Sequence, residues 1–372
     1  MQRFILTYLS ILFIFQLQAQ SELAQIEATV NDYINGTSYN QVEVITRAFH
    51  PESDLFLDGK DGKLWIVPSK EYISWFEKNE RDVFNGRIGR ILSVEHFGNI
   101  AMAKAEILLP KIEKRFIDMF ILKKVEGAWK IISKTANSEV SNRMGKKVLF
   151  VVSNADRYGD TELTTGNSFS EITNAYHVLD QAGIAIDFVS PAGGAVPLAY
   201  INTSDAQQRD YVYNQDFMYA LKNTKTPTQV KAADYEAIYY VGGGAAMFGT
   251  PENTAIQQLA MDIYEKQNGI VAAICHGTAG IAHLKTSDGK YLVDGKTVSG
   301  YPESFERQES DHFKTFPFLI QKTIEKHGGT FKVGARNTPF MQTSKRVITG
   351  QNHLSAQLVA EQILQEMGKE KM

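Results

Sequence analysis

The sequence predicts two domains of different class: an α+β cone, followed by an α/β domain built on a doubly wound, largely parallel sheet. A length of 372 residues exceeds the usual size of one domain. Helical patterns precede strand patterns in the first part of the chain, whereas strands and helices alternate in the second. Residues 138–146 are polar and lack apolar periodicity, so we expect a linker there, between a domain over 21–137 and a domain over 147–372.

The first residues have the pattern of a secretory signal. Residues 1–3 carry one positive charge, residues 4–17 are almost wholly apolar, and Ala19 supplies a small residue at a plausible cleavage point. The apolar run is short for a transmembrane helix, and an uncleaved anchor is the alternative. We therefore expect a signal peptide over 1–19 and a protein exported to the periplasm or the extracellular space, without stable membrane association after cleavage.

The first domain is expected to begin with two helices. Apolar residues recur at helical spacing over 23–33 and 39–49. Strand patterns follow at 54–57 and 63–67, and a short helical pattern covers 69–77. Further strand candidates complete the domain: 86–97, 100–110, 114–125 and 127–132. Helices followed by a curved antiparallel sheet make an α+β cone.

This order of elements, with its ending over 116–120 and 127–131, resembles the NTF2-like superfamily, and within it the lumazine-binding or SnoaL-like group. The resemblance implies a cone that holds a pocket. The candidate lining residues are His50, Asp54, Trp65 and Trp75. We favour the alternative in which both tryptophans belong to the core and His50 caps a turn, and we assign this domain no chemistry.

In the second domain, strand patterns alternate with helical ones. The strands are expected at 148–153, 184–190, 237–241, 271–274 and 347–350, and the helices at 168–182, 255–267 and 354–365. Ligands of such sheets bind beyond the carboxyl ends of the strands. Cys275 and residues 242–244 both lie at such ends.

Cys275 is the single cysteine of the chain. It follows a buried strand over 271–274, and a helix-compatible run over 278–284 comes after it. A strand-to-helix turn of this kind is typical of a nucleophile elbow, and a helix start favours thiolate. The alternative is an ordinary buried cysteine, since free cysteine is among the most buried residue types.

Several short strings of this domain, taken in order, resemble the DJ-1/ThiJ/PfpI superfamily, whose fold is similar to that of class I glutamine amidotransferases. They lie at 187–194, 234–238, 242–244, 273–277 and 348–352. The domain is most similar to the Hsp31-type branch, which includes glutathione-independent glyoxalase III enzymes.

The resemblance implies a set of catalytic residues. Cys275 matches the nucleophile, and Glu171 falls at the position of the acid that shares a proton with it. His276 is implied to turn aside from the sulfur and to be oriented by a carboxylate, for which Glu306 is preferred over Glu303.

Backbone groups are implied to complete the site. Gly243 and Gly244 let N–H groups approach a substrate oxygen, and with the N–H of His276 they would form an oxyanion hole. The sequence departs from the branch at this point, because residues 242–245 read Gly-Gly-Gly-Ala instead of Gly-Gly-His-Gly. The departure leaves the substrate open.

Two absences narrow the chemistry. Glutaminase chemistry needs a downstream His-x-Glu pair, and His353 has no Glu two residues on. No cluster has zinc-ligand spacing, so we expect no metal. The remaining histidines of this domain are expected at the surface or as satisfied core groups: His177, His283, His312 and His327.

We therefore expect an exported cysteine-dependent enzyme of stress response that acts on small reactive carbonyls. In the glyoxalase III-like version, methylglyoxal becomes lactate without glutathione, metal or nucleotide, as in a hydro-lyase of the D-lactate dehydratase type. A PfpI-like amidase or peptidase, or a non-enzymatic chaperone or redox sensor, are the alternatives. The net charge of −3 and the lack of long basic runs argue against nucleic acid as a partner. A homodimer is expected, because both resembled families often form one.

Overall fold

The computed structural model describes residues 22–59 and 61–369. The predicted signal peptide, residues 1–19, lies outside the described residues. The contacts divide the chain after Met144 into two compact units, and each is described by itself. Within the described ranges, no helix combines the length and the apolar character that crossing a bilayer requires.

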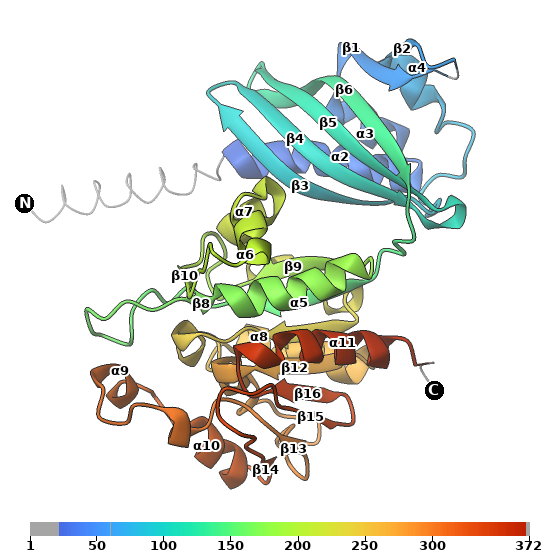
Figure 1. The fold of residues 1–372 in the computed structure, drawn as a ribbon. Helices are drawn as coiled ribbons and strands as arrows, with labels where there is room; N and C mark the ends of the chain where they lie inside the picture. The colour runs from blue at the N-terminus through green and yellow to red at the C-terminus, as the bar shows by residue number, and fades with distance from the viewer. Residues whose placement is uncertain (1–21, 60, 370–372) are drawn as a thin grey trace, which may run out of the picture. The chain divides into compact units, whose positions relative to one another are not determined.

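The N-terminal domain packs helices against a six-stranded sheet (Figure 1). The helices are α2 (Glu22–Tyr39), α3 (Val42–Ala48) and α4 (Ser69–Ser74). The strands are β1 (Phe49–Asp58), β2 (Leu64–Pro68), β3 (Ile88–Phe97), β4 (Ile100–Leu109), β5 (Lys114–Val125) and β6 (Ala128–Val140), in the order β2-β1-β6-β5-β4-β3. Ile26, Val30 and Tyr33 of α2 are fully buried, because their helical spacing places them on one face. The predicted α+β cone is confirmed.

Three details of this domain differ from the prediction. The sheet is not wholly antiparallel, since β1 pairs with β6 in parallel. Strand β6 runs to Val140, which pairs with Lys114, so the sheet extends into the expected linker. The tryptophans are not core residues: Trp65 is 43% exposed and Trp75 41% exposed. Trp65 lies on the edge strand β2, and the two indoles stack on each other at 5.5 Å. His50 does cap a turn, because its Nδ1 accepts the N–H of Glu52 at 3.2 Å.

The C-terminal domain has a central six-stranded sheet, in the order β15-β16-β12-β11-β7-β9. Its strands are β7 (Lys147–Val151), β9 (Ala185–Val189), β11 (Ala237–Tyr240), β12 (Ile270–Ile274), β15 (Met341–Ser344) and β16 (Val347–Gly350). All neighbours pair in parallel except β15 with β16. The predicted largely parallel sheet is confirmed.

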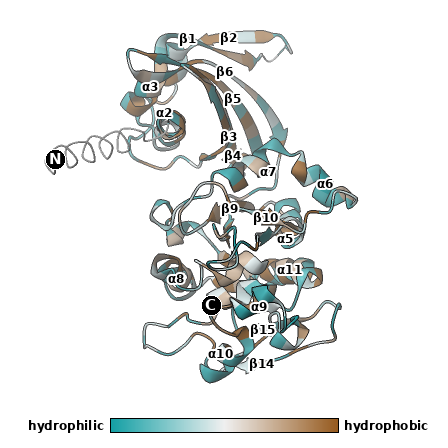
Figure 2. Ribbon diagram, turned by 90° about the vertical axis from the view of Figure 1, so that its left-hand side faces the viewer, coloured by the Kyte–Doolittle hydropathy of each residue, from teal (hydrophilic) through white to brown (hydrophobic). Residues whose placement is uncertain are grey.

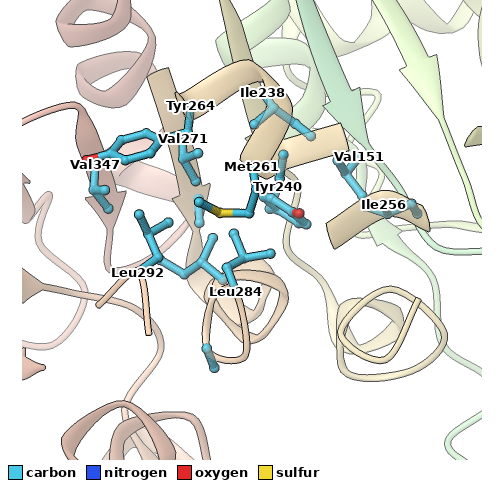
Figure 3. Close-up of a cluster of buried hydrophobic side chains, with 14 of the residues drawn as sticks. Val151, Ile238, Tyr240, Ile256, Met261, Tyr264, Val271, Leu284, Leu292 and Val347 are labelled. Atoms are coloured by element: carbon cyan, nitrogen blue, oxygen red, sulfur yellow. The ribbon is translucent and has the colours of Figure 1, made fainter. Parts of the chain in front are cut away.

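Helices cover both faces of this sheet, because alternate residues of each strand point to opposite sides. Val148 and Phe150 of β7 belong to the apolar cluster with α5 (Phe169–Gln181) and α11 (Ala356–Met367). Leu149 and Val151 belong to the cluster that includes α8 (Thr254–Met261). Figure 3 shows that second cluster, in which strand residues such as Val151 and Ile238 pack near Ile256 and Met261 of α8. Figure 2 shows hydrophobic residues concentrated on the strands of the sheet.

Short elements between the strands were not predicted from the sequence. They are β8 (Asn167–Ser168), β10 (Leu198–Ala199), α6 (Ala206–Val212), α7 (Gln215–Lys222), β13 (Thr297–Val298), α9 (Asp311–Lys314), α10 (Ile320–Lys326) and β14 (Thr330–Phe331). The helix expected over 255–267 is α only to Met261 and continues as a π-helix, η5 (Asp262–Lys266). The run expected as a helix over 278–284 is instead the 3₁₀ helix η6 (Cys275–Ile281).

Candidate active site

A cavity of about 700 Å³ opens in the C-terminal domain beyond the carboxyl ends of β11 and β12. Its lining brings together the predicted site residues Cys275, Glu171, His276, Glu306 and Gly243. The other lining residues are Tyr158, Ser168, Ser170, Tyr200, Asn202, Gln208, Tyr301, Phe305, Arg307, His312, Phe316, Arg336 and His353. The site therefore lies where the topology of a parallel sheet places its ligands.

Cys275 stands at the sharp turn between β12 and η6. Its φ is +54°, a left-handed conformation that is uncommon for residues other than glycine. The residue is only 8% exposed, yet it lines the cavity. Most of the other non-glycine residues with positive φ are Asn, Asp, Glu or Lys; the exception, Tyr200 with φ +58°, also lines the cavity. Strained backbone of this kind clusters at functional sites.

Glu171 lies in the first turn of α5 and is 2% exposed. Burial raises its pKa to about 8, although hydrogen bonds from Cys275 and from the backbone of Gly242 oppose the rise. The carboxyl is therefore protonated at pH 7. Its Oε2 atom has no partner in full hydrogen-bonding geometry among the described residues. Glu171 thus places an acidic proton next to the thiol.

The pKa of the Cys275 thiol is shifted upward, whereas a helix start that favours thiolate would lower it. Burial and the neighbouring Glu171 raise it well above its ordinary value, although the backbone N–H of His276 opposes the rise. This direction does not support the expected thiolate, because η6 is a short 3₁₀ helix and the sulfur is desolvated.

His276 lies between the sulfur and a carboxylate. Its Nε2 is 2.7 Å from Glu306 Oε1, and its Nδ1 is 3.6 Å from Cys275 Sγ. The expectation that His276 turns aside from the sulfur is therefore wrong, since 3.6 Å is within reach of a hydrogen bond to sulfur. The imidazole also stacks on Tyr301 at 4.7 Å. Glu306 and Tyr301 together fix the orientation of the ring.

The structure distinguishes the two candidate carboxylates. Glu303 Oε1 accepts the N–H of Gln321 at 2.9 Å and thereby caps α10. Glu306 bonds His276 and also lies 3.8 Å from His312 Nε2. Glu306, not Glu303, is thus the acid that contacts His276.

The glycines after β11 have different surroundings. A Cβ on Gly242 would overlap Glu171 Oε2 and lie 2.9 Å from the Cβ of Cys275, so the acid and the thiol can approach only past a glycine. Gly243 has φ +99° and lines the cavity. Gly244 begins η4 (Gly244–Met247) and packs against Tyr158; it is not among the lining residues. The oxyanion-hole role of these backbone groups stays a prediction.

Several lining residues were missed by the sequence analysis. His312 was expected at the surface or as a satisfied core group, but it lies beside Glu306 and 5.2 Å from the ring of Tyr158. Tyr200 and Arg336 come from segments without periodicity, so no local pattern indicated them. Within the part of the chain that the structure describes, no group of His, Cys, Asp and Glu is arranged to hold a metal ion.

The fold and the site define a class of protein: a doubly wound α/β domain with a nucleophile elbow, whose cysteine lies beside a buried acid. The model of the DJ-1/PfpI family matches residues 146–312. A probable glutathione-independent glyoxalase, hsp3104 of Schizosaccharomyces pombe, is 32% identical over 163 residues, which cover 41% of this chain and 71% of that protein. The chain therefore belongs to the DJ-1/PfpI family. The "Putative lumazine-binding" model matches residues 21–136, which confirms the resemblance of the N-terminal domain.

Other relatives agree with this assignment. The glutathione-independent glyoxalase hsp3102 of S. pombe is 29% identical over 232 residues, covering 58% of this chain and 95% of that protein. The solved structure of Rapid Encystment Protein 24 KDa of Francisella tularensis is 27% identical with a TM-score of 0.57; it covers 60% of this chain and 100% of its own. The structure of glyoxalase III of Candida albicans, 24% identical with a TM-score of 0.53, covers 60% of this chain and 97% of its own. That last match bears on the fold alone.

Proposed function

We propose that this protein is a cysteine-dependent enzyme that converts small 2-oxoaldehydes into 2-hydroxy acids without glutathione. The observation that carries the proposal is the juxtaposition of Cys275 with the protonated carboxyl of Glu171 in a cavity. The glyoxalases among the relatives support the same reaction class.

The geometry suggests the following steps for methylglyoxal. The Cys275 thiol passes its proton to His276 Nδ1 and its sulfur attacks the aldehyde carbon; a C–S bond forms, and Glu171 gives its proton to the carbonyl oxygen, which yields a hemithioacetal. The Glu171 carboxylate formed in this way removes the hydrogen from the former aldehyde carbon as a proton and returns it to the adjacent carbon of the enediol. The aldehyde carbon is thereby oxidised to a thioester and the ketone reduced to an alcohol. Water then cleaves the C–S bond, releasing lactate and the thiol.

His276 and Glu306 would support the final hydrolysis. With its Nε2 held by Glu306, the ring presents Nδ1 to the sulfur, where it can deliver a proton to the leaving thiolate. In the overall reaction, one methylglyoxal and one water give one lactic acid, so no external oxidant or reductant is required.

Purified protein tests the proposal directly. We expect methylglyoxal to disappear and lactate to form in equal amounts, and kcat/KM to fall at least about 1000-fold in Cys275→Ala. Lactate formation at an unchanged rate in Cys275→Ala would remove the thiol from the reaction.

A cysteine hydrolase acting on amides or esters is the second candidate. The 3.6 Å approach of His276 Nδ1 to Cys275 Sγ, with Glu306 behind the ring, is the arrangement such a nucleophile needs. Release of a fluorophore from amide or ester substrates, faster than turnover of any 2-oxoaldehyde and lost in Cys275→Ala, would favour this candidate.

We also propose that the protein is exported and forms a homodimer. Export rests on the charged, apolar and small-residue segments over 1–19. Mass spectrometry of the protein secreted by its host should find a new N-terminus after Ala19. Sedimentation of that mature form should give twice the chain mass. An intact N-terminus would contradict export with cleavage, and a monomer would contradict the homodimer.

A further inference from the structure

The cavity is much larger than the simplest substrate of the proposed reaction. Its volume of about 700 Å³ lies within the range of roughly 300–1,000 Å³ that holds drug-sized ligands. Methylglyoxal has only a few non-hydrogen atoms. The unused space must therefore be assigned either to water or to a further part of the natural substrate.

The charged groups that line the cavity are mostly cationic. Glu171 is neutral at pH 7, and Glu306 is engaged by His276. Arg307 and Arg336 both line the cavity, and no lysine or aspartate does. The lining thus offers two guanidinium groups against one carboxylate that already has a partner.

Both arginines keep donors available. Among the described residues, no ion pair or hydrogen bond engages the guanidinium of Arg307, although its backbone oxygen is fixed by the N–H of Ser310 at 2.8 Å. Arg336 donates one N–H to Phe305 O at 2.8 Å and lies over the Phe305 ring, 5.4 Å from its centroid. Arg336 also hydrogen-bonds the side chain of Tyr301. A guanidinium carries five N–H donors, so Arg336 keeps further donors for a ligand.

A row of aromatic rings leads from His276, beside the reacting sulfur, to Arg336. His276 stacks on Tyr301 at 4.7 Å, and the Tyr301 ring is 6.0 Å from that of Phe305, which in turn carries Arg336. A ligand that reaches from Cys275 to Arg336 must therefore extend past the dicarbonyl group by several bonds.

We propose that the cavity selects 2-oxoaldehydes that carry an anionic substituent, and that Arg307 and Arg336 bind this substituent. The planar guanidinium fork suits both a carboxylate and a phosphate. The statement rests on the proposed function, because it names the substrate class of that same site.

Matched substrates test the selection. The anions are 4,5-dioxopentanoate, which carries a carboxylate, and 2-oxo-3-phosphooxypropanal, which carries a phosphate; the neutral reference is the methyl ester of 4,5-dioxopentanoate. We expect kcat/KM for at least one anion to exceed that of the ester about tenfold or more, chiefly through KM. A larger gain with one anion identifies the natural group. The ratio of kcat/KM for the anion to kcat/KM for the ester should fall in high salt, since both arginines are exposed and salt screens their charge.

The variants decide whether the arginines are responsible. In Arg307→Gln/Arg336→Gln the ratio of anion to ester should fall to about one, whereas Arg209→Gln, on α6 outside the cavity, should keep the ratio of the parent protein. Equal kcat/KM for anions and ester, or an undiminished ratio in the double variant, would overturn the inference.

A binding measurement separates this inference from the proposed function. Calorimetry with Cys275→Ala uses 4-oxopentanoate, a ketone that lacks the aldehyde and cannot turn over, and its methyl ester. In Cys275→Ala the acid should bind and the ester should not, and binding of the acid should be lost when Arg307→Gln and Arg336→Gln are added to this variant. That result supports anion recognition even if no 2-oxoaldehyde is converted. Turnover of methylglyoxal without selective binding of the acid would leave the proposed function standing and refute the inference.

Discussion

The protonation of Glu171 links the site to the stability of the fold. Its pKa is raised from 4.5 to about 8 by burial, so the folded state holds a proton that the unfolded state has released. Its contribution to stability is complete below pH 4.5 and is lost as the pH rises towards 8. Relative to Glu171→Gln, the parent protein should lose up to about 1.4 kcal/mol of unfolding free energy per pH unit across that window.

Urea denaturation of both proteins at several pH values between 4 and 9 measures this difference. The two stability curves should separate with rising pH and run parallel above pH 8. A difference that is independent of pH would mean that Glu171 titrates normally in the folded protein.

The neighbouring acids Glu306 and Glu303 form a matched pair of substitutions. Glu306→Gln removes the carboxylate from His276 Nε2 and should lower kcat by about 10- to 100-fold at nearly unchanged thermal stability. Glu303→Gln weakens the cap of α10 and should leave kcat unchanged while lowering stability by about 0.5–1 kcal/mol. Steady-state kinetics and thermal melting of both variants check this; equal losses of kcat would refute the assignment.

A site residue could be predicted where it lies on or next to a segment with clear apolar periodicity. Glu171 lies in the first turn of a helix that the apolar pattern predicted, and the family resemblance identified it there as the acid. Glu303 begins the one-turn 3₁₀ helix η7 (Glu303–Phe305) and Glu306 follows it, and a segment this short has no apolar periodicity that shows which acid meets His276. His312 and Arg336 reach the cavity only through tertiary folding, for which a single sequence carries no local signal.

At the level of secondary structure, the turn between β12 and η6 stores backbone strain at Cys275. The φ of +54° is costly for any side chain with a Cβ. Both Cys275→Ala and Cys275→Gly should be inactive, but the glycine variant should be more stable by about 1 kcal/mol, because glycine adopts this conformation freely. Thermal unfolding compares them; an alanine variant as stable as the glycine variant would show that the turn is relaxed.

Strands were predicted better than the segments between them. The strands of the C-terminal sheet are continuous apolar runs, since both of their faces are buried. The segment after Cys275 was predicted as an α-helix, yet close packing of Gly277 and Gly280 against Tyr240 accompanies a 3₁₀ helix instead. Elements such as α6 and α7 are short and follow no long apolar pattern, so propensity alone could not place them.

For the whole molecule, the division into two units has a functional consequence. All residues that line the cavity belong to the unit over Gly145–Met372, and that unit has its own apolar clusters. Residues 145–372 expressed alone should therefore fold cooperatively and convert methylglyoxal with a kcat/KM within about tenfold of the full chain. Circular dichroism and a lactate assay measure both properties; a folded but inactive fragment would show that the N-terminal unit is required.

The fold class of the whole chain could be predicted because its two patterns are so different. A segment in which helices precede strands predicts an α+β domain. A segment in which strands alternate with helices predicts an α/β domain with a parallel sheet. The chemical identity of the substrate could not be predicted, since it depends on lining residues that come from at least five separate segments of the C-terminal unit.

The pH dependence of Cys275 alkylation is the most direct test of the central claim, the coupling of this thiol to Glu171. Iodoacetamide reports on Cys275 alone, because the chain has no other cysteine. In the parent protein, the alkylation rate should rise with an apparent pKa near 8 that belongs to the pair, as the ionised carboxyl takes up the thiol proton. In Glu171→Gln this step should be absent, and alkylation should begin only at higher pH, because burial raises the pKa of the thiol itself. Identical profiles in the two proteins would contradict the account.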